Sequence, residues 1–361
     1  MSHTKKKSLF EKVSSSFSLK GVAFNFIKNT MMGQKLLLYN LKLPRVINIS
    51  MNEQTCMYQC RMCPFYESDV RNMYKNKSEM SYETLKNIVS SVPNDSIYSF
   101  DISAIGETLS FNRLPEFISY MKGKKPKVNT IISTNALLLT EKKMQQLIES
   151  KLDNIQLSLY AHSKADYKWL TGRDSFEKVK NNVIKASELR QNMGLDKPYL
   201  QAFMMGAKEF DGIYDDFISF WNNYVDHAFI RPLYNVGKKD LNGLTPTFKK
   251  MPKRYPCVMP WYSTAIRSNG DVLACYNFHW YDKKHKIGNI NKNSLTEIWN
   301  NNIINKFRED HLKLNIDKYN ACKECVLWDA YTNIWDKSGK NYTYQLRTKD
   351  LFNSVNDYRG G

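Results

Sequence analysis

Three cysteines lie close together in the first quarter of the chain, at Cys56, Cys60 and Cys63, in the spacing C-x3-C-x2-C. Thiolates are soft ligands that select iron–sulfur clusters or zinc. A cubane iron–sulfur cluster usually takes four cysteines, but the next cysteine in the sequence is Cys257. A cubane held by only three thiolates has one iron that is open to a ligand from outside the protein. The spacing therefore predicts a cluster with one open coordination position.

Two other interpretations of these three cysteines compete with the cluster. Their positions also follow the i, i+4, i+7 pattern of a buried helix face, and thiolates bind zinc as well as iron. The residues between the cysteines are polar, and Pro64 disfavours a helical conformation for Cys63. The preceding segment, 45–50, alternates like a strand. A loop at the end of a strand is therefore favoured over a helix, and zinc stays an alternative.

Strand-like and helix-like segments alternate between residues 45 and 235. The predicted strands are 46–50, 98–104, 129–134, 154–159, 199–204 and 227–231, and the predicted helices are 81–92, 113–122, 140–151, 175–191 and 211–224. Repeated βα units form a parallel sheet with right-handed crossovers. Six units predict an α/β fold, a partial (β/α)6 barrel of the TIM type. Active sites of such barrels lie at the carboxyl ends of the strands, where the first cysteine loop falls.

The C-x3-C-x2-C loop after the first barrel strand resembles that of the radical S-adenosylmethionine (SAM) enzymes. The resemblance implies a [4Fe-4S] cluster on Cys56, Cys60 and Cys63 whose open iron is chelated by SAM. It also implies a 5′-deoxyadenosyl radical that abstracts hydrogen from a substrate C–H bond. SAM-binding roles at the ends of the later strands fall on Gly106, Glu107, Ser133, Asn135, Ser158 and Arg173.

Each of these implied SAM contacts has a chemical reason. Gly106 lets the backbone approach the ligand, and Glu107 supplies a carboxylate for the SAM amino group. Hydroxyl and amide groups at Ser133, Asn135 and Ser158 suit the polar, neutral parts of SAM. An arginine can pair with the SAM carboxylate, although a surface ion pair is the plainer alternative for Arg173. The sequence departs from the family pattern at Met62, Ile105, Ala136 and Tyr160.

The other four cysteines lie in the C-terminal third of the chain. Residues 268–271 predict a β-hairpin turn between the segments 263–267 and 272–275, so that Cys257 and Cys275 can face one metal site. The run C-x12-G-x4-C, the Gly-Asn-Ile step at 288–290 and a capping box at 294–297 resemble the SPASM domain of radical SAM enzymes and its shortened form, Twitch. The three further cysteines of a full SPASM domain are absent from this sequence.

This second resemblance implies an auxiliary [4Fe-4S] cluster that is closed by four thiolates and relays electrons. Its ligands would be Cys257, Cys275, Cys322 and Cys325, and its shielding aromatic side chains would be Trp261, Tyr262, Trp280 and Trp328. Burial of this kind tunes the reduction potential of a cluster. A structural zinc on the same four cysteines is the alternative.

Composition and charge restrict the setting of the protein. The 361 residues carry a net charge of +18, and no apolar run is long enough for a membrane-spanning helix. Clustered cysteines without a secretion signal predict a reducing, cytoplasmic setting. The predicted organisation is a basic arm at 1–44, the barrel at 45–235, a linker at 236–256, the auxiliary-cluster domain at 257–330 and a tail at 331–361. Peripheral contact of the arm with anionic lipid and packing of the arm on the core are both consistent with its eight lysines and single acid.

Three and four cysteines account for all seven, so no thiol remains to return a hydrogen atom to a substrate radical. This favours oxidation, with the leftover electron passed to the auxiliary cluster, over epimerisation. The resemblance to Twitch enzymes, which oxidise an aminocyclitol, implies an oxidoreductase that dehydrogenates a carbohydrate- or aminocyclitol-like small molecule. Tyr160, His162 and Lys208 are the candidate proton acceptors. The positive charge favours an anionic sugar or nucleotide-sugar. The reaction also requires an electron donor, such as flavodoxin or ferredoxin.

Three other functions are weighed against this one. A maturase of ribosomally made peptides, which installs a crosslink or alters a side chain, is the main alternative, although the arm at 1–44 is short for a leader-binding domain. A tRNA-modifying enzyme would use the basic charge, but no RNA-binding module is recognisable, so nucleic acid is not expected as a partner. A non-catalytic electron carrier would need a fourth ligand at the first site.

Overall fold

The structure is a computed structural model that describes residues 26, 29–38, 42–53, 56–74, 79–103, 105–233, 241–246, 253–280, 285–323 and 325–330. Most of the predicted N-terminal arm, parts of the predicted linker and the whole predicted tail lie outside these residues. The domain boundaries drawn from the sequence therefore stay predictions.

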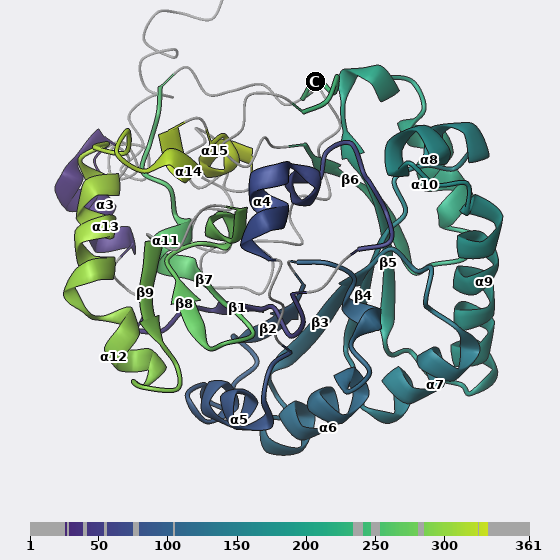
Figure 1. The fold of residues 1–361 in the computed structure, drawn as a ribbon, viewed down its shortest axis with the longest axis horizontal. Helices are drawn as coiled ribbons and strands as arrows, with labels where there is room; N and C mark the ends of the chain where they lie inside the picture. The colour runs from purple at the N-terminus through teal and green to yellow at the C-terminus, as the bar shows by residue number, and fades with distance from the viewer. Residues whose placement is uncertain are drawn as a thin grey trace, which may run out of the picture.

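One nine-stranded sheet runs through the molecule in the order β6-β5-β4-β3-β2-β1-β7-β8-β9 (Figure 1). Six strands, β1 to β6, pair in parallel in sequence order, as the partial barrel requires. Their bounds are β1 (Val46–Ile49), β2 (Ser99–Ile102), β3 (Asn129–Thr134), β4 (Asn154–Ser158), β5 (Tyr199–Gly206) and β6 (His227–Pro232). The α/β fold predicted from the sequence is confirmed, with every strand within a few residues of its predicted position.

Helices cover the outer face of the parallel strands (Figure 1). They are α5 (Tyr82–Ser90), α6 (Leu114–Lys124), α7 (Glu141–Glu149), α9 (Phe176–Asn192) and α10 (Tyr214–Trp221). The hydroxyl groups of Ser81 and Thr140 cap α5 and α7 by accepting the backbone N–H three residues later, which fixes where each helix begins. The additional helix α8 (Lys164–Thr171) lies between β4 and α9 and was not predicted.

The C-terminal part continues the same sheet. The predicted hairpin is present as β7 (Ser263–Ile266) and β8 (Asp271–Leu273), and β9 (Lys286–Asn289) adds a third antiparallel strand. β7 also pairs in parallel with β1, with Val46 opposite Ser263. Gly270 forms the turn at a φ of +85°, and a Cβ atom there would meet the Asn291 side chain at 2.6 Å, so only glycine fits this turn.

Short helices surround this C-terminal sheet. They are α11 (Met259–Tyr262), α12 (Leu295–Trp299), α13 (Asn302–Leu312), α14 (Asn320–Lys323) and α15 (Leu327–Ala330), and α3 (Met31–Leu38) lies against α13. The predicted capping box is present, because Ser294 and Glu297 each accept the other's backbone N–H. None of the helices within the described ranges is long and apolar enough to cross a membrane.

Alternate residues of the parallel strands face the barrel interior, and many of them are polar. On β2 these are Ser99 and Asp101, and on β4 they are Asn154, Gln156 and Ser158. The residues between them, such as Phe100 and Ile155, are fully buried under the helices. A barrel that is filled with packed apolar side chains shows the opposite interior. The interior of this barrel is therefore a polar cavity, called the chamber below, rather than a packed apolar core.

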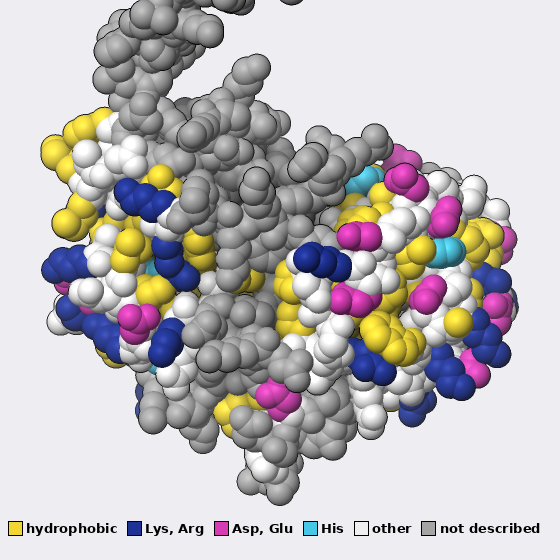
Figure 2. All heavy atoms as spheres, turned by 90° about the horizontal axis from the view of Figure 1, so that it is seen from above, with side chains coloured by type: hydrophobic (Ala, Val, Ile, Leu, Met, Phe, Trp, Pro, Cys, Tyr) yellow, Lys and Arg dark blue, Asp and Glu magenta, His cyan; other side chains and the backbone are white. Residues whose placement is uncertain are grey.

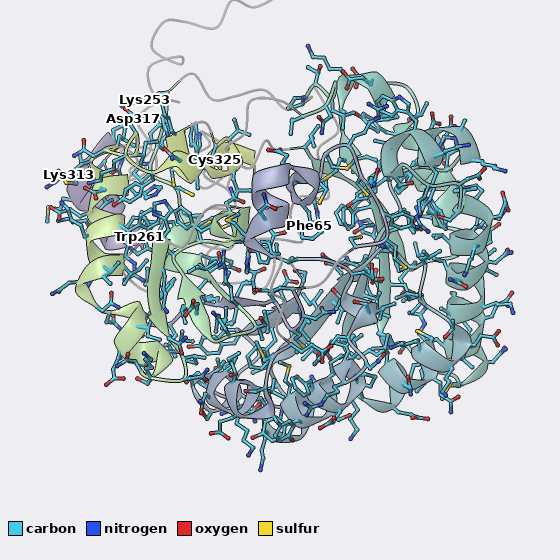
Figure 3. The ribbon with its side chains drawn as sticks, viewed as in Figure 1. Phe65, Lys253, Trp261, Lys313, Asp317 and Cys325 are labelled. Carbon is cyan, nitrogen blue, oxygen red and sulfur yellow. The ribbon has the colours of Figure 1, made fainter. Side chains whose placement is uncertain are left out.

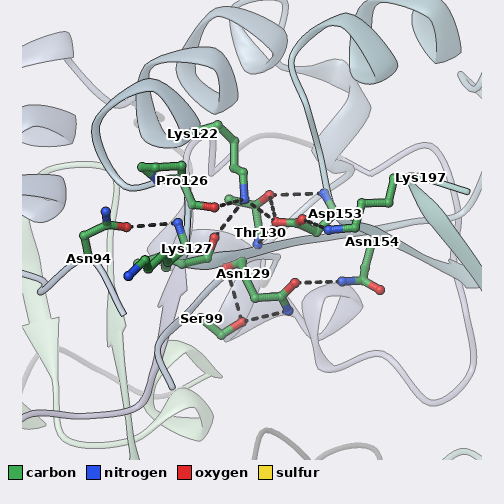
Figure 4. A network of polar contacts seen from close by, with 11 residues as sticks. Asn94, Ser99, Lys122, Pro126, Lys127, Asn129, Thr130, Asp153, Asn154 and Lys197 are labelled. Carbon is green, nitrogen blue, oxygen red and sulfur yellow. Dashed lines mark hydrogen bonds and ion pairs between the residues drawn. The ribbon is translucent and has the colours of Figure 1, made fainter. Parts of the chain in front are cut away.

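A polar network lies at the amino-terminal end of the strands (Figure 4). The carboxylate of Asp153 accepts hydrogen bonds from Lys122 at 2.6 Å, from Lys197 at 2.5 Å and from the Thr130 backbone at 3.0 Å. Burial alone would raise the pKa of Asp153, but these donors outweigh burial and lower it. Beside it, Asn154 donates to Asn129 at 2.9 Å. The network ties β3 to β4 at the end opposite to the cysteines.

Charged side chains of both signs cover the described surface. On the face seen in Figure 2, Lys and Arg side chains lie interspersed with Asp and Glu side chains. The exposed ion pairs include Lys185 with Glu141 and Lys313 with Glu309. The described part of this face therefore presents no single large basic area, in spite of the net charge of +18.

Candidate active site

The first cysteine group lies on an irregular loop between β1 and the 3-10 turn η1 (Pro64–Tyr66). Residues 56–63 form no helix, so the helix interpretation of the cysteine spacing is wrong. The loop is held by its backbone, because Gln59 and Arg61 donate their N–H groups to Thr171 and Leu170 at the end of α8. The unpredicted helix α8 therefore supports the loop that carries the cysteines.

The three thiols of this loop share one environment. All three line the same cavity. Burial raises the pKa of the Cys60 thiol well above its ordinary value, and the neighbouring Cys63 and Cys56 thiols raise it further. Burial also raises the pKa of the Cys56 thiol, and hydrogen bonds from the Tyr58 backbone and the Asn135 side chain partly offset this rise. Converging thiols with donors aimed at their sulfur suit a thiolate-bound metal group.

Within the described ranges, no three His, Cys, Asp or Glu side chains lie close enough together to hold a single metal ion. A cubane holds its cysteine sulfurs farther apart than a single ion does. The cysteine assignments therefore rest on the convergence of the thiols and stay predictions.

Gly106 and Glu107 follow the end of β2. Gly106 has a φ of +78°, which glycine adopts without strain. The Glu107 carboxylate is 2% exposed and accepts hydrogen bonds from the Thr134 hydroxyl at 2.5 Å, the Asn135 backbone at 3.0 Å and the Leu109 backbone at 3.0 Å. Burial raises its pKa, and these donors oppose that effect. In this structure Glu107 connects the end of β2 to the end of β3; its predicted contact with the SAM amino group stays a prediction.

Ser133, Asn135 and Ser158 all line the cavity. Asn135 donates its Nδ2 hydrogen to the Cys56 sulfur at 3.8 Å, and its side-chain oxygen accepts from the Leu137 backbone. The next residue, Ala136, has a φ of +61°, a conformation that favours glycine. Residues from the ends of β3 and β4 thus meet the cysteine loop, as the sequence predicts.

Arg173 lies apart from the other predicted SAM-binding residues. Its side chain is exposed, and it is not among the residues that line the cavity. The chain turns outward just before it, because Gly172 ends α8 in the left-handed conformation at a φ of +69°. Its role in binding the SAM carboxylate stays a prediction that the arrangement of the described residues does not support.

Among the three candidate proton acceptors, Tyr160 alone lines the cavity. Burial raises its pKa, with the Cys60 and Cys63 thiols and Arg231 among its electrostatic neighbours. Lys208 is exposed on η3 (Lys208–Phe210). His162 is half-buried beside Phe220. The three therefore do not come together.

The cavity has a volume of about 450 Å³ and runs through the barrel. Its walls include two charged side chains that the sequence analysis missed, Asp101 on β2 and Arg231 on β6. The signal was present in the sequence, because Asp101 lies two residues before Ser103 in a strand that alternates polar and apolar side chains. Met259, Tyr262, Tyr276 and Leu327 from the C-terminal part form the remaining wall.

The second cysteine group is more enclosed. Cys257, Cys275, Cys322 and Cys325 are each 8–9% exposed and line one small void. Burial raises the pKa of all four thiols, and the thiols of Cys257, Cys275 and Cys322 are raised further by other members of the group. In Figure 3, Cys325 is labelled in the C-terminal part of the molecule, on the side away from the barrel helices α7 and α9. The hairpin and the C-terminal turn thus bring the four predicted ligands together.

Polar groups around this second site point at sulfur. The Cys325 sulfur accepts from the Asn277 side chain at 3.2 Å and from the Leu327 backbone at 3.3 Å. A ring nitrogen of the buried His311 lies 3.7 Å from the Cys322 sulfur. Arg254 donates to the carbonyl groups of Cys322 and Cys325. Sequence analysis missed Asn277, His311 and Arg254, since none has a fixed spacing from the cysteines.

Leu327 lines both the large cavity and the void between the four cysteines. Tyr276 follows Cys275 directly and also lines the large cavity. Of the predicted shielding residues, Trp328 borders the void and Trp261 and Tyr262 are buried, whereas the Trp280 side chain lies outside the described residues. The two cysteine sites are thus separated by the chamber and a thin layer of side chains.

Comparisons with known proteins agree with this arrangement. Residues 54–196 match the family model of the radical SAM superfamily, and residues 257–326 match the SPASM iron–sulfur cluster-binding domain. The S-adenosyl-L-methionine-dependent 2-deoxy-scyllo-inosamine dehydrogenase of Niallia circulans is 24% identical over 309 residues, which cover 84% of this chain and 99% of that protein. A probable GTP 3′,8-cyclase of Methanococcus maripaludis is 34% identical, over 37% of this chain and 43% of that protein.

Solved structures share the fold. BtrN in complex with AdoMet and 2-DOIA has a TM-score of 0.50 at 20% identity, over 79% of this chain and 93% of that one. Native anSMEcpe with bound AdoMet has a TM-score of 0.57 at 16% identity, over 87% and 100%. SuiB of Streptococcus suis bound to precursor peptide SuiA has a TM-score of 0.56 at 16% identity, over 92% and 80%.

The two domain matches together span more than half of the chain. They confirm both resemblances stated from the sequence and the predicted cofactors, a SAM-binding [4Fe-4S] cluster and an auxiliary iron–sulfur cluster. The chain belongs to the radical SAM superfamily and carries a SPASM domain in its C-terminal part.

Proposed function

We propose that the protein is a SAM-dependent dehydrogenase of a small polyhydroxylated molecule of the aminocyclitol or carbohydrate class. The observation that carries this proposal is the position of Leu327, which borders both the chamber and the enclosed four-cysteine site. A substrate in the chamber therefore lies next to a site that can accept one electron. Oxidation of a C–H bond beside a hydroxyl group produces such an electron, whereas a redox-neutral rearrangement does not.

In this reaction the substrate loses a hydrogen atom, a proton and an electron. When bound, the first cluster and SAM supply a 5′-deoxyadenosyl radical that takes a hydrogen atom from the substrate carbon. The hydroxyl proton passes to a group in the chamber wall, and one electron leaves through the side of the chamber that Tyr276 and Leu327 form. The carbon becomes a carbonyl group. Glu107 and Asn135 hold the wall beside the cysteine loop in place through their hydrogen bonds.

The substrate class is supported by the relative from Niallia circulans, whose name describes a dehydrogenase of 2-deoxy-scyllo-inosamine. The chamber is also lined by hydroxyl, amide and carboxyl groups, which suit a ligand that is rich in hydroxyl groups. Its charged lining consists of Asp101 and Glu107 against Arg45 and Arg231. A balanced lining favours a neutral or amino-bearing substrate over the anionic sugar predicted from the net charge.

An acidic one-electron carrier, such as flavodoxin or ferredoxin, is proposed as the reductant. The net charge of +18 attracts an acidic protein over a range set by the ionic strength. The rate of reduction by such a carrier should therefore fall as salt is added, whereas reduction by a small chemical reductant should not.

The test is turnover by the anaerobically reconstituted enzyme. With SAM, a chemical reductant and 2-deoxy-scyllo-inosamine, we expect equal amounts of 5′-deoxyadenosine and of a ketone two mass units lighter than the substrate, measured by mass spectrometry. Enzyme without added substrate is the control. No 5′-deoxyadenosine under any condition would contradict radical SAM activity. 5′-Deoxyadenosine without a ketone, together with turnover of a co-encoded peptide, would favour a peptide maturase instead.

A further inference from the structure

Asp101 is a half-buried carboxylate with spare hydrogen-bonding capacity in the chamber. It lies on β2, opposite Asn48 of β1 and two residues before Ser103, and it lines the cavity. The Ser103 hydroxyl donates to Oδ1 at 2.9 Å. Among the described residues, no donor to Oδ2 of Asp101 is present. A carboxylate oxygen is a hydrogen-bond acceptor, so Oδ2 is available to a donor group of a ligand in the cavity.

Arg231 is a cationic residue in the wall of the same chamber. It lies on β6, and one guanidinium nitrogen donates to the Gln156 side chain at 3.0 Å. The guanidinium stacks over the Phe203 ring at 4.0 Å and lies near the Phe229 ring at 5.6 Å. These contacts fix the plane of the guanidinium, and Arg231 lines the cavity. A guanidinium held in this way is a preorganised donor to oxygen atoms.

The two charges face one cavity without forming an ion pair within the described part of the chain. Burial raises the pKa of Asp101, and Arg231 lowers it from a distance. Gln156 and Ser133 lie between them, on β4 and β3, and are bonded to each other at 3.4 Å. The carboxylate and the guanidinium therefore lie on different strands of one cavity wall, where a single ligand in the cavity can contact both.

We propose that Asp101 and Arg231 are the two ends of the substrate-binding subsite. Asp101 accepts hydrogen bonds from an ammonium group or a hydroxyl group of the substrate, and Arg231 donates to a hydroxyl oxygen at the opposite end. The subsite selects an amino polyol over a phosphorylated sugar, because a phosphate would lie beside the Asp101 carboxylate. This inference rests on the proposed function for the identity of the chamber as the place where the substrate binds.

The position of Tyr160 connects this subsite to the cysteine loop. Tyr160 and Arg231 both pack against the Phe203 ring, and Tyr160 lines the same cavity as Cys60 and Cys63. A ligand bound at Arg231 therefore lies in the cavity that the cysteine loop also faces.

The experiment measures binding without turnover, so that it does not depend on the reaction. Calorimetric titration uses reconstituted enzyme with SAM and no reductant. The probes are 2-deoxy-scyllo-inosamine, uncharged scyllo-inositol and myo-inositol 1-phosphate. The variants are Asp101→Asn and Arg231→Gln, and Asp215→Asn, an exposed position on α10, is the matched control. Iron content and SAM affinity are measured for each variant.

We expect the wild type and the control to bind the amine about tenfold more tightly than scyllo-inositol, since hydrogen bonds to charged groups are of this strength. Asp101→Asn should abolish this preference, while Arg231→Gln should weaken the binding of both probes about tenfold. Iron content and SAM affinity should not change. If Asp101→Asn does not retain iron, the binding data for Arg231→Gln alone test the inference.

Three outcomes would overturn the inference. They are an unchanged preference for the amine in Asp101→Asn, unchanged binding of both probes in Arg231→Gln, and tighter binding of the phosphate than of the amine by the wild type. Failure of the proposed function is distinguishable from these, because it would appear in the turnover assay as 5′-deoxyadenosine without a ketone while the binding pattern persists.

Discussion

The two groups of cysteines offer the same predicted ligand atoms in different surroundings. Cys56, Cys60 and Cys63 are half-buried on a loop and face a cavity of about 450 Å³. The four C-terminal cysteines are 8–9% exposed and enclosed by side chains such as Phe278, Phe307 and Trp328. The first site is open on one side to an incoming molecule, and the second is closed.

The hydrogen bonds to sulfur also differ in length. At the first site, the Asn135 side chain donates to the Cys56 sulfur at 3.8 Å, in addition to a hydrogen bond from the Tyr58 backbone. At the second site, Asn277 and the Leu327 backbone donate to Cys325 at 3.2 and 3.3 Å. Hydrogen bonds to sulfur and burial both set the potential of a cluster. The comparison suggests that the first site is built to exchange ligands and the second to hold and release an electron.

The largest effect is expected from removing a ligand of the open site. Cys56→Ala should abolish formation of 5′-deoxyadenosine and reduce the iron content from about eight to about four atoms per chain, because a cubane contains four irons. Iron analysis and chromatography of the reaction products measure both. The matched control is Cys322→Ala, which should keep SAM cleavage. Formation of 5′-deoxyadenosine by Cys56→Ala would show that the loop is not the SAM-binding site.

Removing the closed site should separate SAM cleavage from substrate oxidation. The double variant Cys322→Ala, Cys325→Ala should still release 5′-deoxyadenosine, while the ketone falls to the background, since the substrate radical has no electron acceptor. The ratio of ketone to 5′-deoxyadenosine is the measurement. An unchanged ratio would mean that the second site is structural, as a zinc site would be, and metal analysis would then find zinc.

A smaller effect is expected from removing one of the hydrogen bonds that hold the Glu107 carboxylate in place. Thr134→Val removes the hydroxyl that donates to Glu107 at 2.5 Å and should weaken SAM binding about tenfold, the cost of a hydrogen bond to a charged group. Equilibrium binding of SAM to the reconstituted protein measures this. The control is Thr140→Val, which removes the cap of α7 and should lower stability by about 1 kcal/mol without changing SAM affinity. Unchanged SAM affinity in Thr134→Val would place Glu107 outside the SAM site.

The smallest effect concerns the potential of the closed site. Asn277→Ala removes the 3.2 Å hydrogen bond to the Cys325 sulfur and should lower the midpoint potential by about 40 mV, the equivalent of about 1 kcal/mol for one electron. Redox titration monitored by electron paramagnetic resonance measures it. The signal of the other cluster is the internal control and should not move. A shift of both signals would indicate a general rearrangement instead.

Local sequence patterns were sufficient for much of the fold. The cysteine spacings, the six βα units and the turn at Gly270 depend on neighbouring residues, and each is found where it was predicted. The parallel pairing of β7 with β1 was not predictable in this way, because Val46 and Ser263 are far apart in the sequence. Nothing in either segment alone specifies its partner.

The candidate site was predictable only where a motif fixed the position. Gly106, Glu107, Ser133, Asn135 and Ser158 line the chamber as expected, since each lies at or within a few residues of the carboxyl end of a strand. Arg173 does not, because the direction of the chain after α8 depends on the left-handed turn at Gly172. Asp101 and Arg231 were missed because neither belongs to a local motif. That they line one cavity becomes visible only when β2 and β6 are placed in the folded barrel.

The pairing of β7 with β1 also has a mechanical consequence. The loop that carries Cys56, Cys60 and Cys63 follows β1, and the hairpin that leads to Cys275 begins with β7, so the two predicted cluster sites are attached to adjacent strands about 4.8 Å apart. The rate of electron transfer falls steeply with distance. Because a shared hydrogen-bonded ladder ties the two sites together, we expect the distance between them to stay constant while substrate enters and product leaves.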